Sequence, residues 1–78
     1  MTTTTKPIEA AKITAARATL IDLHERLFEL TGLVDEAINY LDAGQMNTTL
    51  GTVVALEQPM KEADALTNAV LILLRRRS

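Results

Sequence analysis

The sequence predicts an all-α protein, a long antiparallel helical hairpin that associates into a homodimeric four-helix bundle with coiled-coil-like packing. Apolar residues recur at alternating steps of three and four along two long segments, the spacing of helices with one apolar face. A short glycine-containing connection separates the segments, so they pack as antiparallel neighbours. The chain has 78 residues and no Cys, and a domain of this size usually needs a disulfide, a metal or association to be stable.

The first helix is expected over residues 6–43, after a disordered tail at residues 1–5. Thr5 can cap this helix, and Pro7 falls in its first turn, where a missing N–H costs little. Gly44 follows at the position where helices commonly end in a left-handed residue. The apolar seam of the first helix consists of Ile13, Ala16, Leu20, Leu23, Leu27, Leu30, Val34, Ala37 and Leu41.

The apolar sector of this helix is wider than a seam between two helices requires. Ile21, Phe28 and Ile38 lie beside the seam, whereas the opposite side carries mainly acidic residues with Arg26 among them. A helix with so broad an apolar sector normally contacts more than one neighbour. We therefore expect two hairpins to dock as a homodimer.

The second helix is expected over residues 48–76, after a turn at residues 44–47, so that residues 6–78 form a single domain. Asn47 and Thr48 are both suitable capping residues. The apolar seam of the second helix consists of Leu50, Val53, Leu56, Met60, Ala63, Leu66, Val70, Leu73 and Leu74.

Pro59 interrupts the second helical segment. A proline removes one backbone hydrogen bond, and here its ring crowds the carbonyl of Ala55, so the helix either kinks or breaks just before it. The apolar phase continues across Pro59, which favours the kink.

The charge and hydropathy of the chain argue against several function classes. The formal net charge of −2 argues against general binding to nucleic acids or anionic membranes. The longest apolar run, residues 69–74, is far too short to cross a bilayer. No signal peptide is visible at the start of the sequence. We therefore expect a cytoplasmic protein.

The residues needed for catalysis or metal binding are not assembled by the sequence pattern. There is no Cys, His24 is the only His, and Ser78 is the only Ser. A di-iron bundle needs inward-facing Glu residues with a Glu-x-x-His motif, whereas the acids of this chain are expected on the solvated side. We expect no enzymatic activity, no metal and no cofactor.

A few residues are candidates for contact with another protein. His24 is either a pH-sensitive interface residue or, as we favour, an edge-of-core histidine with its polar tip in water. Tyr and Met supply adaptable contact area at interfaces, although Tyr40 and Met46 are equally well explained as a cover for the end of the bundle. The candidate partner-binding residues are Ile21, His24, Phe28, Tyr40 and Met46.

The cluster Arg75, Arg76 and Arg77 is a weak basic patch. It is explained more simply as cations that complement the carbonyls at a helix C-terminus. Residues 30–41 superficially look like a helix-turn-helix, but their charged side chains are Asp35 and Glu36, which would repel DNA.

Taken together, these features predict a non-catalytic protein–protein interaction module, an adaptor, inhibitor or regulator of an unidentified protein partner. In style, a short, acidic, Cys-free hairpin is similar to accessory proteins of bacteria and phages. Two alternatives stay open, a nucleic-acid-associated regulator that uses the paired Arg clusters and a purely structural assembly unit. Fold alone does not choose among them.

Overall fold

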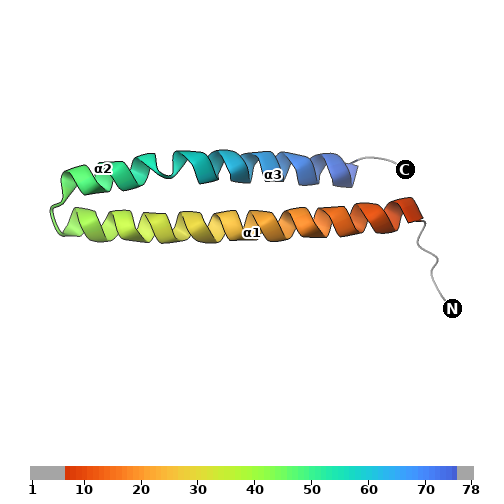
Figure 1. Cartoon of the computed structure of the whole chain (residues 1–78), viewed down its shortest axis with the longest axis horizontal. Helices are drawn as coiled ribbons and strands as arrows, with labels where there is room; N and C mark the ends of the chain where they lie inside the picture. Colours follow the sequence, from red (N-terminus) through yellow and green to blue (C-terminus); the bar gives the residue numbers. More distant parts are fainter. Residues whose placement is uncertain (1–6, 76–78) are drawn as a thin grey trace.

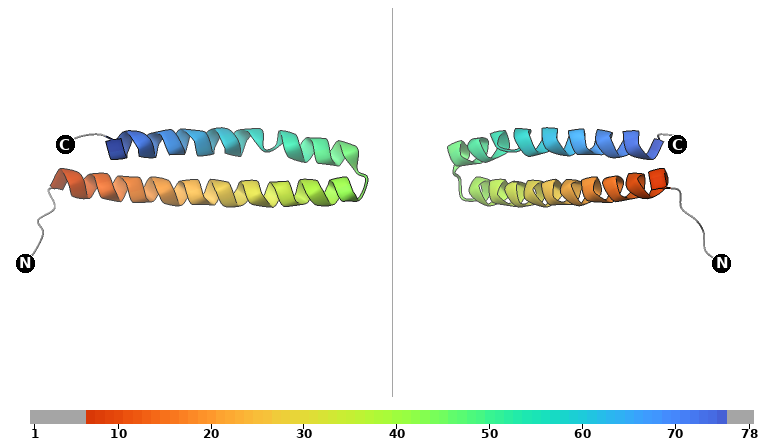
Figure 2. Two further views of the ribbon diagram at one scale, coloured as in Figure 1. Left: turned by 180° about the vertical axis from the view of Figure 1, so that it is seen from behind. Right: turned by 45° about the vertical axis from the view of Figure 1, so that its right-hand side comes forward.

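The computed structural model describes residues 7–75 of the chain as a helical hairpin (Figure 1). Helix α1, Pro7–Asp42, forms one arm, and helices α2, Met46–Val54, and α3, Glu57–Arg75, form the other. The second arm lies beside α1 along its length in each view of Figure 2. The described residues contain no strand, so the predicted all-α helical hairpin is confirmed. The predicted four-helix bundle requires a second copy and stays a prediction.

Two of the features expected from the sequence fall outside the part of the chain that the structure describes. These are the tail at residues 1–5 and the last two members of the Arg cluster, Arg76 and Arg77.

Helix α1 ends in a left-handed glycine, which reverses the chain. Gly44 has a φ of +76°, a conformation that glycine adopts without the steric cost of a Cβ. The Gln45 amide donates to the Tyr40 carbonyl (2.9 Å) and the Gly44 amide to the Leu41 carbonyl (3.0 Å). These two bonds form a Schellman motif and satisfy carbonyls at the helix end. The predicted role of Gly44 is confirmed.

The second arm begins at Met46, two residues before the expected position 48. Gln45 occupies the N-cap position, although its side chain makes no capping hydrogen bond. The Gln45 carbonyl accepts from both the amide and the hydroxyl of Thr49, at 2.9 and 2.8 Å. Asn47 and Thr48 therefore lie inside the first turn of α2 rather than at its cap.

The second arm is bent by a two-residue interruption before Pro59. Helix α2 ends at Val54, and the Leu56 amide bonds to the Val53 carbonyl (3.0 Å), a bond of the tighter i→i−3 type. Pro59 has no N–H to donate to the Ala55 carbonyl, so the helical ladder cannot continue through this point. In the first turn of α3, the missing donor of Pro59 costs little. The second arm is therefore bent at residues 55–56, between α2 and α3, at the place where the sequence predicted either a kink or a break.

The two arms meet through small side chains. The buried residues of the described chain are Ala16, Ala37, Pro59, Ala63 and Val70. Small residues let two helices approach closely, but each alanine removes little apolar surface from water. The hairpin therefore has close helix–helix packing without a large hydrophobic core.

The surface of α1 that faces the second arm is rotated relative to the predicted seam. It includes four residues of that seam, which are half-buried or buried: Ala16, Leu23, Leu30 and Ala37. Between them, however, the positions turned to the second arm are more polar. The intervening buried or half-buried residues are Lys12, Thr19, Arg26, Leu33 and Tyr40. The other predicted seam residues are exposed in a single chain: Ile13, Leu20, Leu27, Val34 and Leu41.

Two glycine substitutions are expected to change stability in opposite directions. Gly44→Ala should destabilise the fold by about 1–2 kcal/mol, because an L-residue is strained in the left-handed conformation. Gly32→Ala, in the interior of α1 with no atom within 4 Å of the added Cβ, should stabilise it by up to about 1 kcal/mol. Urea unfolding followed by circular dichroism at one protein concentration measures both. Equal effects of the two substitutions would contradict the described turn.

Candidate protein-interaction surface

One side of the hairpin carries an exposed row of large apolar side chains. On α1 the row consists of residues at steps of seven, Ile13, Leu20, Leu27, Val34 and Leu41, and their side chains are 43–60% exposed. A step of seven returns to the same side of a helix after two turns. The row therefore follows α1 along nearly its whole length, on one side of the contact with the second arm.

The second arm contributes apolar residues to the same side. Leu74 of α3 lines an open groove of about 470 Å³ together with Ile13 and Leu20 of α1. Leu74 and Met60 each come directly after a residue of α3 that faces α1. Leu50 and Val53 each come directly after a residue of α2 that faces α1. Met46 lies one turn before Leu50. We call this surface the apolar face, and it comprises Ile13, Leu20, Leu27, Val34, Leu41, Met46, Leu50, Val53, Met60 and Leu74.

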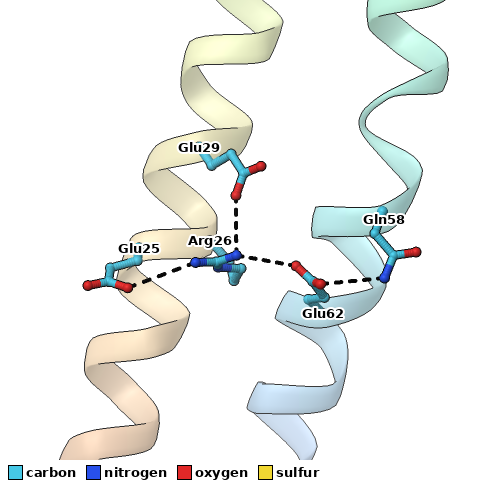
Figure 3. Close-up of polar contacts among 5 residues, drawn as sticks. All are labelled: Glu25, Arg26, Glu29, Gln58 and Glu62. Carbon is cyan, nitrogen blue, oxygen red and sulfur yellow. Dashed lines mark hydrogen bonds and ion pairs between the residues drawn. The ribbon is translucent and has the colours of Figure 1, made fainter.

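The opposite side of the hairpin is polar. The Arg26 guanidinium lies 3.4 Å from a carboxylate oxygen of Glu62 on α3, 3.4 Å from Glu29 and 3.9 Å from Glu25 (Figure 3). The Gln58 amide donates to the second carboxylate oxygen of Glu62 at 3.4 Å. The Arg26–Glu62 pair joins the two arms and fixes the level at which α1 and α3 meet.

A second groove lies on this polar side, lined by Asp22, Arg26, Glu62, Ala65 and Leu66. Charged groups keep their hydration when they stay at the surface, so removing this side from water is costly. The hairpin thus has one side suited to burial in an interface and one suited to contact with solvent.

Within residues 7–75, the structure contains no group of three or more His, Cys, Asp or Glu side chains arranged to hold a metal ion. No helix in the same range has the length and apolar character to cross a membrane. No family model, curated protein or solved structure matches the chain. The surface chemistry of the hairpin is therefore the basis on which its function can be inferred.

The candidate partner-binding residues lie in two places. Ile21 and His24 line the groove at the edge of the apolar face, and His24 and Phe28 line a neighbouring depression with Leu27. Met46 is 65% exposed at the start of α2, whereas Tyr40 is half-buried among the residues turned to the second arm. The five candidates therefore form a group of three on α1 and a separate pair near the turn.

The predicted dimer and core seam also divides into two sets. Leu23, Leu30, Leu56 and Val70 are half-buried or buried between the arms. The remaining members are exposed, and all belong to the apolar face: Leu20, Leu27, Val34, Leu41, Val53, Met60 and Leu74. Arg75 is exposed in the last turn of α3, where its charge complements the helix carbonyls.

The Arg26–Glu62 pair was not among the contacts predicted from the sequence. The sequence did contain a signal for this pair. Arg26 lies three residues after Leu23 and four before Leu30, and Glu62 lies next to Ala63, so both charges border a predicted seam. An oppositely charged pair at such borders indicates a contact between two neighbouring helices.

Arg26→Gln should lower the free energy of unfolding by about 1–2 kcal/mol, because three surface pairs of 0.2–1 kcal/mol are lost together and the carboxylates are left without their cation. The loss should shrink at 1 M salt, where exposed charges are screened. Denaturant unfolding at low and high salt measures it. Lys61→Gln, at an exposed position of α3, is the control. A loss that salt does not change would contradict an electrostatic role for Arg26.

Proposed function

We propose that the protein is a non-catalytic protein–protein interaction module that works as a helical homodimer. In this proposal the apolar face of one hairpin packs against the apolar face of a second copy and completes a four-helix bundle. The observation that carries the proposal is the exposure of ten large apolar side chains on one side of a hairpin whose buried residues are Ala, Pro and Val.

The size of the apolar face supports a dimer. Full burial of a Leu, Ile or Met side chain contributes about 1.5–3 kcal/mol, so burial of the exposed half contributes about 1 kcal/mol. Ten such residues on each copy give a gross gain on the order of 20 kcal/mol, against an association cost of about 4–15 kcal/mol. A contact of this size is therefore sufficient to hold two copies together.

The shape of the hairpin supports the same conclusion. The Cα atoms extend over 62 × 22 × 12 Å, so the hairpin is one helix thick in its shortest direction. Two such layers in face-to-face contact give the packing of a four-helix bundle, with neighbouring helices about 8–10 Å apart. The half-buried Leu23 and Leu30, which border the apolar face, would then lie in a closed core.

The dimer would leave Phe28 available to a larger partner. Phe28 is the most exposed large apolar residue of the described chain, at 66%, and with Ile21 it lies on the side of α1 away from the second arm. A helix that offers an aromatic residue and an aliphatic one a helical repeat apart suits recognition in an apolar groove. An adaptor, inhibitor or regulator of a cytosolic protein is the role that fits such a surface.

Leu27→Glu should convert the protein from dimer to monomer, because two carboxylates would be buried at the centre of the apolar face. The mass of the unaltered protein should be twice the 8.5 kDa of one chain, and the variant should have the mass of a single chain. Light scattering after size exclusion, over a range of concentrations, measures both masses.

Ile72→Glu is the matched control for that experiment. Ile72 is also exposed, at 64%, but it lies seven residues after Ala65, on the polar side. Its substitution should leave the dimer intact. A monomer of the unaltered protein at all concentrations, or equal dissociation by both substitutions, would overturn the proposal.

A further inference from the structure

We infer that the two hairpins of the homodimer pair in opposite directions, with α1 of each copy packed on α1 of the other. The turn of each hairpin then lies at the open end of the second copy, the end at which α1 begins and α3 ends (Figure 1). In this arrangement Arg17 pairs with the second copy's Asp35. The inference rests on the proposed homodimer and specifies how that dimer is built.

Two face-to-face arrangements satisfy two-fold symmetry and keep neighbouring helices antiparallel. An axis across the helices places α1 over the second copy's α1, with the two turns at opposite ends. An axis parallel to the helices places α1 over the second copy's second arm, with both turns at one end. Both arrangements bury the apolar face, so they differ in the charged residues that they bring together along its edges.

The charged residues of the hairpin are distributed unevenly along its length. The turn end, residues 27–60, has neither Lys nor Arg and carries five carboxylates: Glu29, Asp35, Glu36, Asp42 and Glu57. The rest of the described chain, residues 7–26 and 61–75, balances five carboxylates with five cations: Lys12, Arg17, Arg26, Lys61 and Arg75. Pairing in opposite directions places each acidic turn end beside the cations of the second copy, whereas pairing in the same direction places the two acidic turn ends together.

The exposed apolar row of α1 gives the register of the two copies. Its five residues lie at steps of seven, with Leu27 in the middle. When the row packs on the same row in the opposite direction, complete overlap brings Leu27 beside the second copy's Leu27 and Ile13 beside its Leu41. This register covers the row along its whole length.

In this register Arg17 lies close to the second copy's Asp35. Arg17 is ten residues before Leu27 and Asp35 is eight after it, so the two levels differ by two residues, about 3 Å along the helix. Arg17 lines an open groove with Leu20 of the row, and Asp35 lines another with Val34. Both charged residues are exposed, and neither has an ion-pair partner among the described residues. The two-fold axis therefore produces two Arg17–Asp35 pairs.

The second arms of the two copies also lie on each other in this register. The Arg26–Glu62 pair, at 3.4 Å, sets the level of α3 against α1 and places Lys61 near the two-fold axis. Glu57 then comes close to the second copy's Asp64, which is unfavourable. Lys61 is exposed and lies one helical turn from both carboxylates, so this edge also contains a cation that offsets their repulsion.

The arrangement with both turns at one end matches these charges less well. At the same level of α3 against α1, it brings Arg17 near the second copy's Arg75 and Asp35 near its Glu57. Like charges across an interface cost free energy. Neither Arg17 nor Asp35 then gains an opposite charge from the second copy.

That arrangement has one favourable polar contact, between His24 and the second copy's Asp64. His24 can donate a hydrogen bond in either protonation state. The Arg17–Asp35 contact, in contrast, joins a permanent cation to a carboxylate, and charge-assisted contacts of this kind are the stronger ones. Pairing in opposite directions is therefore favoured.

Charge reversal tests the Arg17–Asp35 contact. In the inferred dimer, Arg17→Asp and Asp35→Arg should each raise the dimer Kd on the order of tenfold, because each reversal makes two attractive contacts repulsive. The doubly substituted protein should regain the Kd of the unaltered protein. Residues 17 and 35 are 18 positions, about 27 Å, apart on one helix, so this recovery can arise only between copies.

The arrangement with both turns at one end predicts the opposite sign. There, Arg17→Asp places a carboxylate near the second copy's Arg75, and Asp35→Arg places a cation near its Glu57. Both single reversals should then lower the Kd. Sedimentation equilibrium over a range of concentrations measures the mass and the Kd of each variant.

Arg17→Asp combined with Glu36→Arg is the matched control. It has the same net charge as the Arg17→Asp, Asp35→Arg protein, but Glu36 lies seven residues after Glu29, on the polar side that faces away from the second copy. Its dimer should stay as weak as that of Arg17→Asp alone. A dimer that the single reversals tighten or leave unchanged, or that both double variants restore equally, overturns the inferred arrangement alone. A monomeric mass of the unaltered protein overturns the proposed homodimer.

Discussion

The close contact between the two arms through alanine, threonine and proline is the constraint on which the rest of the structure depends. Ala16, Ala37 and Ala63 allow the arms to approach, and of the leucines of α1 only Leu23, Leu30 and Leu33 are half-buried between them. Leu20, Leu27 and their neighbours must then lie on the side of the hairpin. A single hairpin therefore has a defined backbone arrangement but buries little apolar surface, and in the proposed homodimer a second copy supplies further burial.

The polar side of the hairpin complements this constraint. Arg26 is held by carboxylates from both arms, including Glu62 across the contact. Surface ion pairs add little to stability, so the main effect of this group is to select one level for α1 against α3 and to keep that side hydrated. The difference between the two sides means that self-association can use one of them and leave the other to solvent.

Much of the fold could be predicted because the local sequence signals all indicate the same structure. The alternating spacing indicates helices, Gly44 ends the first one, and the short turn requires antiparallel arms. The sequence did not predict which side of α1 contacts the second arm. Ala16 and Leu23 fit equally well into a helical series that includes Leu20 and into one that includes Thr19. Hydrophobicity favours the first series, whereas the hairpin uses the second between its own arms.

The candidate site was predicted less completely for the same reason. Ile21, His24 and Phe28 are neighbours on one helix, so sequence spacing brings them together without knowledge of the fold. Tyr40 was grouped with Met46 by proximity to the turn, but its position in the helical repeat directs it to the second arm. The bend before Pro59 follows from backbone chemistry, so it could be predicted from the proline although the apolar phase continues across it.

The central claim is that the apolar face of the hairpin is stable only when a second copy covers it. Thermal unfolding followed by helical circular dichroism over a wide range of protein concentrations tests this claim directly. If folding and association are coupled, Tm rises steadily with concentration, because mass action stabilises the folded dimer. A Tm that does not change with concentration would mean that the single hairpin is stable by itself, and would contradict the claim.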